Sequence, residues 1–69
     1  MVEKEEFYRD LGGLLRDIRY ERELTQQEMA ESLGVSLRAY QTYEHGKAAM
    51  PAFVLWRIEY MYGDVVLNA

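Results

Sequence analysis

The segment from Thr25 to Gly46 constrains the fold of this chain most, because its end signals allow only two short helices joined by a tight turn. Thr25 and Glu28 have the spacing of a capping box, in which each side chain satisfies a free backbone amide of the other residue, so a helix begins there. Gly34 ends that helix, since glycine adopts the left-handed conformation at little cost. Two helices this short cannot bury a core alone, so flanking helices are required.

The second helix of this pair has one apolar and one polar side. Ser36 is a suitable N-cap, and Gly46 is a suitable residue just beyond the helix end. At about 100° per residue, one side collects the core candidates Ala39, Tyr40 and Tyr43. The other side collects Leu37, Arg38, Gln41, Thr42 and His45. This second side is nearly free of acid and can form hydrogen bonds, so it can present side chains to base edges.

We expect a first helix from near Glu6 to Arg22. Its core side is a narrow apolar stripe made of Phe7, Leu11, Leu14, Leu15 and Ile18. Gly12 and Gly13 inside the helix each cost about 1 kcal/mol relative to alanine, and the close approach of another backbone would explain them. The alternative is a break at the glycines, with Asp10 as a later N-cap. We favour one continuous helix.

An ordered series of short motifs runs through most of the chain. The series is Leu11-Gly12, Leu15, Arg19, Leu24-Thr25-Gln26, Ala30, Leu33-Gly34-Val35-Ser36, Glu44-His45-Gly46-Lys47 and Pro51. Each motif alone is a weak signal, but together, in this order and spacing, they resemble the Cro and phage-repressor type of helix-turn-helix domain, also called the XRE-like family. The resemblance covers residues 11 to about 63 and implies an all-α, lambda-repressor-like fold of four to five short helices.

The resemblance also implies how such a domain meets DNA. The helix 37–45 would enter the major groove with its N-terminal residues at the base edges, and the start of the preceding helix would point backbone amides at a phosphate. The DNA-binding candidates are Gln26, Ser36, Leu37, Arg38, Gln41, Thr42 and Lys47. For each of them the alternative is an ordinary solvated surface residue.

The candidates differ in the contacts that their side chains can make. Arg38 can bind guanine O6 and N7 with two hydrogen bonds, and Gln41 can pair with adenine or reach a phosphate. Leu37 or Thr42 can contact a thymine methyl group, although an exposed leucine serves a protein partner equally well. The remaining candidates are expected to contact the DNA backbone.

In the family the arginine of the first helix pairs with the glutamate near the end of the reading helix. The resemblance therefore implies a structural ion pair between Arg19 and Glu44. Arg22 lies on a similar side of its helix and is the competing partner.

We expect a fourth helix from Pro51, in its first position, to Tyr62, closed by Gly63. One apolar side carries Leu55, Ile58 and Tyr62 and can face the core. A second stripe, nearly opposite, carries Phe53, Trp56 and Tyr60. Aromatic residues of this kind are enriched at interface centres, so we infer a protein contact, most simply a homodimer. The alternatives are that the tail Asp64 to Ala69 folds over this stripe, or that the tail itself provides the dimer contact.

The formal net charge of −4 and the isoelectric point near 4.8 argue against DNA binding, which depends on neutralising phosphates with Lys and Arg. The acidic residues are unevenly distributed, however, since most of them precede the helix pair. Residues 37–50 contain two cationic residues, Arg38 and Lys47, and one acidic residue, Glu44. The loop 47–50 has Ala48, Ala49 and Met50 where further cations would help. We therefore expect weak, salt-sensitive binding by the monomer.

A chain of 69 residues is expected to form one domain over 1–69, with the helix pair at about 25–46 and loosely ordered ends at 1–5 and 64–69. It has no cysteine, which suits a reducing cytoplasm, and we expect neither a signal peptide nor a membrane span. His45 is the only histidine and cannot form a metal site alone. We expect no cofactor and no small-molecule ligand, and no motif indicates an enzyme.

Two hypotheses of different kinds follow from the sequence. The first is a sequence-specific DNA-binding transcriptional regulator that works as a dimer. The second is a helix-turn-helix fold used as a protein–protein interaction module, antitoxin-like or anti-regulator in character, with weak or no DNA binding.

Overall fold

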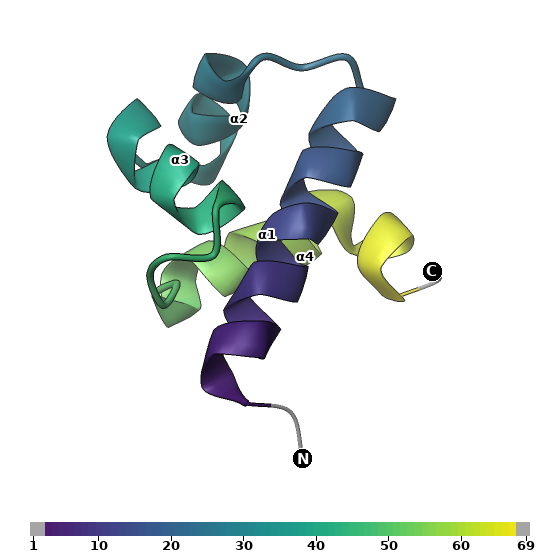
Figure 1. The fold of residues 1–69 in the computed structure, drawn as a ribbon. Coiled ribbons are helices and arrows are strands. Elements are labelled where there is room, and N and C mark those ends of the chain that lie inside the picture. Colours follow the sequence, from purple (N-terminus) through teal and green to yellow (C-terminus); the bar gives the residue numbers. More distant parts are fainter. Residues whose placement is uncertain (1–2, 68–69) are drawn as a thin grey trace.

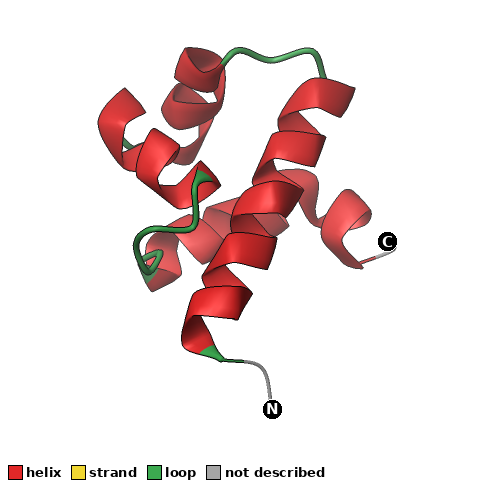
Figure 2. Ribbon diagram, in the orientation of Figure 1, coloured by secondary structure: helices red, strands yellow, loops and turns green. Residues whose placement is uncertain are grey.

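The computed structural model describes residues 3–67, with side chains through residue 63, and this part of the chain contains four helices and no strands (Figures 1 and 2). The helices are α1 (Lys4–Glu21), α2 (Gln26–Leu33), α3 (Leu37–Glu44) and α4 (Ala52–Leu67). In Figure 1, α2 and α3 lie beside α1, and α4 crosses behind it. The all-α expectation is confirmed. None of these helices combines the length and apolar character needed to cross a membrane.

Helix α1 is continuous through both of its glycines, as expected, and has no break at Asp10. It begins at Lys4, so residues 4 and 5, which we expected in a loosely ordered end, are already helical. The helix ends in a tight turn in which Glu23 has a positive φ of 55° and the Leu24 amide donates to the Arg19 carbonyl at 2.9 Å.

The predicted signals of the helix pair are present. The Thr25 hydroxyl accepts a hydrogen bond from the Glu28 amide at 3.0 Å, and the Glu28 carboxylate accepts one from the Thr25 amide at 2.9 Å. Gly34 is left-handed, with φ 73°, and the Ser36 hydroxyl accepts from the Ala39 amide at 3.1 Å. These local bonds determine where α2 ends and α3 begins.

The core lies where all four helices meet. Its buried hydrophobic members are Leu15, Ile18, Met29, Ala30, Leu33, Tyr40, Tyr43, Met50, Val54, Ile58 and Tyr62. Leu11 and Leu14 pack against this cluster as partly buried residues, so most of the predicted stripe of α1 is confirmed.

Two of our expectations about burial are wrong. Phe7 is 48% exposed, because the first turns of α1 project beyond the other helices (Figure 1), and its ring meets Tyr8 edge-on with centroids 5.1 Å apart. Met50 is only 5% exposed, so it belongs to the core and does not occupy a surface position where a cation would help.

Helix α4 differs from the expected helix at both ends. Pro51 lies one residue before the helix, and its carbonyl accepts from the Leu55 amide at 3.2 Å. Gly63 does not close the helix: Tyr62 has non-helical angles (φ −130°, ψ 17°) that make a kink, and the backbone is helical again through Leu67. On the core side of α4, Ile58 and Tyr62 are buried as expected, but Leu55 is only partly buried and Val54 is buried in its place.

Two side chains of α4 tie this helix to α2. The Tyr62 and Ser32 hydroxyls lie 3.0 Å apart, and Arg57 Nη1 donates to the Ser32 carbonyl at 3.1 Å. The Tyr62 ring is 5% exposed and lies under the Arg22 guanidinium at 5.0 Å. The Tyr62 ring therefore packs in the core although the backbone bends at this residue.

The two glycines of α1 have different roles. A Cβ on Gly12 would lie 2.5 Å from the Glu44 carbonyl oxygen and 2.6 Å from that of Tyr43, so the last turn of α3 can approach α1 only where no side chain intervenes. A Cβ on Gly13 would meet nothing within 4 Å. The expected close approach is therefore confirmed at Gly12 and absent at Gly13.

This difference predicts opposite effects for two neighbouring substitutions. We expect Gly12→Ala to destabilise the fold by about 1–3 kcal/mol, because the methyl group must displace backbone atoms of α3. We expect Gly13→Ala to stabilise it by up to about 1 kcal/mol, since alanine is the better helix former. Thermal unfolding followed by circular dichroism measures both, and equal shifts for the two variants would contradict the close approach at Gly12.

Candidate nucleic-acid interface

The outward side of α3 and the start of α2 form a shallow hollow of about 510 Å³. It is lined by Gln26, Arg38, Gln41, Thr42, His45 and Lys47. All of these except His45 were DNA-binding candidates on sequence grounds, so most of the predicted set shares one surface. His45 was not in that set, although its place on the polar side of α3 could have included it.

Ser36 and Leu37 precede this hollow at the start of α3. The Ser36 hydroxyl oxygen already accepts from the Ala39 amide, so it retains its own hydrogen as a donor. Leu37 is 36% exposed and offers a modest apolar contact. These two candidates lie next to the hollow without lining it.

The cations of the hollow are exposed. The side chain of Arg38 makes no hydrogen bond or ion pair with the described residues, and the same is true of the side chain of Lys47. The Thr42 hydroxyl donates to the Arg38 carbonyl at 2.9 Å, so Thr42 can offer its methyl group but not its hydroxyl hydrogen. Among the described side chains no carboxylate lines the hollow, so it is locally positive on an acidic chain.

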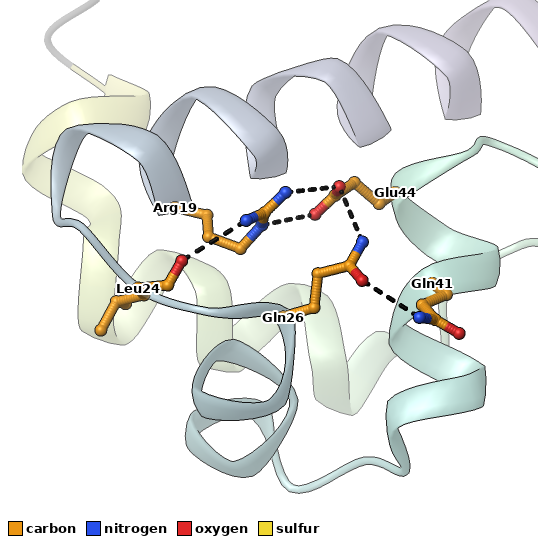
Figure 3. A network of polar contacts seen from close by, with 5 residues as sticks. All are labelled: Arg19, Leu24, Gln26, Gln41 and Glu44. Atoms are coloured by element: carbon orange, nitrogen blue, oxygen red, sulfur yellow. Dashed lines mark hydrogen bonds and ion pairs between the residues drawn. The ribbon is translucent and has the colours of Figure 1, made fainter.

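Beneath the hollow, the expected ion pair between Arg19 and Glu44 is present (Figure 3). Arg19 Nε donates to Glu44 Oε2 and Arg19 Nη2 to Glu44 Oε1, both at 2.9 Å. Arg19 Nη1 reaches the Leu24 carbonyl at 3.4 Å. The side chains are only 11% and 4% exposed, so this bidentate pair joins α1, the α1–α2 turn and α3 in a partly dry environment. Arg22, the competing partner, instead lies over the Tyr62 ring.

The surroundings of the pair shift three pKa values. Burial alone would raise the pKa of Glu44, but hydrogen bonds, chiefly from Arg19, hold it below its ordinary value. The same hydrogen bonding raises the pKa of Arg19. Burial raises the pKa of the adjacent Tyr40 hydroxyl, and the Glu44 charge raises it further. Glu44 is therefore ionised, and Tyr40 neutral, throughout the physiological pH range.

Two of the DNA-binding candidates are connected to this ion pair. Gln26 Nε2 donates to Glu44 Oε1 at 3.2 Å, and Gln41 Nε2 donates to Gln26 Oε1 at 3.0 Å (Figure 3). Sequence reasoning treated these glutamines as independent surface residues. Their connection depends on how α2 crosses α3, and the sequence offers no signal for it.

A second exposed surface lies on α4. Phe53, Trp56 and Tyr60 are 52%, 58% and 77% exposed, and the Trp56 and Tyr60 rings stack with centroids 5.3 Å apart. Trp56 and Tyr60 also line a hollow of about 380 Å³ together with Arg57 and Met61. The alternative that the tail from Asp64 onward folds over or replaces this surface concerns side chains outside the described residues.

The candidate interface lies within a segment that matches a known protein family. A family model described as a helix-turn-helix domain matches residues 10–59, which include the whole hollow and the ion pair beneath it. No curated protein and no solved structure matches the chain. Among the described residues, no group of His, Cys, Asp and Glu could hold a metal ion.

Replacing Glu44 tests the ion pair and its pH dependence. We expect Glu44→Gln to destabilise the fold by about 3 kcal/mol at pH 7, because it leaves Arg19 without its counter-charge. The folded-state pKa of Glu44 lies below its unfolded value, so its contribution is complete above the unfolded pKa and is lost as pH falls through the folded one. The stability difference between wild type and variant should therefore stay constant from pH 7 to about pH 5 and shrink at lower pH.

Urea unfolding at several pH values measures this difference. Glu59→Gln is the matched control, since Glu59 is exposed on α4 and the same charge is removed there. A pH-independent difference for Glu44→Gln, or an equal effect of the control, would argue against a structural carboxylate at residue 44.

Proposed function

The chain belongs to the helix-turn-helix domain family, and on that premise we propose that it is a sequence-specific transcriptional regulator of the Cro/XRE type, working in the cytoplasm as a homodimer. The single observation that carries the proposal is the hollow on α3, which gathers exposed Arg38 and Lys47 without a carboxylate. An α-helix with its side chains is about 10–12 Å wide and fits a major groove about 12 Å wide. In this proposal α3 is the reading helix.

The contacts can be divided by chemistry. Arg38 lies in the first turn of α3, and its side chain has no partner among the described residues, so it suits guanine O6 and N7. Leu37 and Thr42 offer apolar contact to thymine methyl groups. Ser36 can donate its hydroxyl hydrogen, and Lys47 its ammonium hydrogens, to phosphate oxygens. In this proposal Gln26, at the start of α2, also contacts the DNA backbone, and His45, which lines the same hollow, joins the set from the end of α3.

The negative net charge reduces affinity without excluding binding. At 0.1 M salt, exposed charges more than about 10 Å apart are largely screened, so only the acidic side chains nearest the hollow would repel a phosphate held there strongly. The few cations present neutralise few phosphates, which predicts modest affinity for one domain. A second domain on a two-fold symmetric site would double these contacts.

We propose that the Phe53, Trp56 and Tyr60 surface of α4 forms the homodimer contact. These rings are among the residues enriched at interface centres, and each is more than half exposed. A stable interface buries about 800 Å² from each partner, which on so small a domain requires an extended surface such as this one. Two identical copies also satisfy the symmetry that a palindromic DNA site demands.

The second candidate function is a protein-interaction module with weak or no DNA binding. The observations that favour it are the net charge of −4 and the exposed aromatic surface of α4, since both suit a protein partner better than a phosphate backbone. Selection of bound duplexes from a random pool at low salt separates the two functions. Enrichment of one site supports the regulator, and absence of enrichment supports the interaction module.

We expect Arg38→Ala to remove the preference for one base pair in the selected site and to weaken binding about tenfold, because a bidentate guanine contact is lost. Arg16→Ala is the matched control, since Arg16 is exposed on α1 and its loss changes the net charge equally. Fluorescence anisotropy with the selected duplex and its single-base variants measures both. If the two variants weaken binding equally, Arg38 contributes only its positive charge and makes no specific contact with guanine.

We expect Trp56→Glu to yield a monomer, because it places a charge at the centre of the aromatic surface. Phe7→Glu is the control, since Phe7 is also an exposed aromatic residue but lies on α1, outside the surface. Light scattering over a concentration series gives the molar mass of each. A Trp56→Glu variant that dimerises as well as wild type would contradict this interface.

A further inference from the structure

We propose that a one-way series of hydrogen bonds from Glu44 through Gln26 orients the side-chain amide of Gln41 so that it recognises adenine in the major groove. We call this series the amide relay. The inference rests on the DNA-reading function proposed above and deepens it. In this proposal Gln26 is a positioning residue and Gln41 the residue that contacts the base.

The direction of the relay begins at Glu44. An ionised carboxylate can only accept hydrogen bonds, and Glu44 Oε1 receives one from Arg19 Nη2 at 2.9 Å and one from Gln26 Nε2 at 3.2 Å. If the Gln26 amide were rotated by half a turn, its oxygen would face the carboxylate oxygen, and two acceptors would be in contact. The buried charge therefore determines which end of the Gln26 amide points inward.

The same reasoning extends to Gln41. Because the Gln26 nitrogen faces Glu44, the Gln26 oxygen faces α3 and accepts from Gln41 Nε2 at 3.0 Å. A rotated Gln41 amide would again bring two oxygens together. Gln41 therefore turns its nitrogen toward Gln26 and its oxygen away from it, as Figure 3 shows.

The group that remains available on Gln41 matches one base. One hydrogen of Nε2 is used in the relay, so the amide presents the oxygen as an acceptor and the second N–H as a donor. Gln41 is exposed and lines the hollow, so this edge is accessible. In the major groove adenine offers the complementary N6 donor and N7 acceptor, whereas guanine offers two acceptors. A freely rotating amide would select less sharply, because it could present either end.

The relay makes Gln26 testable as a positioning residue. We expect wild-type protein to select a site with adenine at one position, preferred about tenfold over other bases. Gln41→Met should abolish that preference. Gln26→Met should reduce it to about threefold or less while leaving the base preferred by Arg38 unchanged, because the Gln41 amide is released. Loss of a Gln26 contact to the DNA backbone would weaken binding to all sequences alike.

Two further variants sharpen the experiment. Gln27→Met is the matched control, since Gln27 is the next residue of α2 and its amide bonds to exposed Glu31 at 3.0 Å, outside the relay. It should leave the adenine preference intact. Gln41→Glu changes an exposed residue and presents only acceptors. It should change the preferred base at that position from adenine to cytosine, whose N4 amino group is a donor.

A measurement without DNA tests the relay separately. In nitrogen-15 NMR spectra the side-chain NH₂ group of Gln41 should exchange slowly with water in the wild type and in Gln27→Met, because one of its hydrogens is bonded. It should exchange several-fold faster in Gln26→Met. A circular dichroism melt of each variant establishes that the fold is retained.

The outcomes distinguish failure of the relay from failure of the proposed function. If wild type selects a site but Gln26→Met keeps the full adenine preference, or if the Gln41-dependent base is not adenine, the relay is wrong and the DNA-reading function stands. If wild type selects no site at low salt, both are wrong. If Gln26→Met and Gln41→Met lose preference at the same position and Gln27→Met does not, the relay is supported.

Discussion

The bidentate ion pair between Arg19 and Glu44 sets the geometry of this small domain. A charge taken out of water is tolerated only if its partner and its remaining lone pairs are satisfied, and the pair achieves this with two short bonds between α1 and α3 and one from Gln26. The pair requires the last turn of α3 to lie directly on α1, which is possible because Gly12 has no side chain there. Helix α3 has eight residues and would be marginal in isolation, so its orientation is supplied by this contact and by the core.

The same interaction reaches the surface. Because Glu44 bonds to Gln26 and Gln26 to Gln41, the interior charge influences how an exposed side chain is presented. The exposed Arg38 and Lys47 line the same hollow as these glutamines, and most acidic residues of the chain precede the helix pair. The aromatic residues of α4 form a second, chemically different surface. The molecule therefore has an ordered polar surface on α2 and α3 and a separate exposed aromatic surface on α4.

Several features of the fold follow from the sequence by itself, because they arise from interactions between residues close along the chain. The Thr25–Glu28 capping box, the left-handed Gly34 and the Ser36 cap depend only on neighbours within a few positions, and all are present. The apolar periodicity of α1 identified most of its core face. The Arg19–Glu44 pair is not local, and it was expected only because the ordered motifs resemble a known family.

The tertiary structure decided what depends on which helices meet. It distinguished Gly12 from Gly13, which are equivalent in sequence, because only one faces α3. Phe7 is exposed because α1 projects beyond its neighbours there, and α4 has a kink at Tyr62 where we expected it to end. The tertiary structure also joined Gln41 to Gln26, fifteen positions apart. Periodicity shows which residues share a side of a helix, but only packing determines what that side touches, because the contacting atoms come from distant parts of the chain.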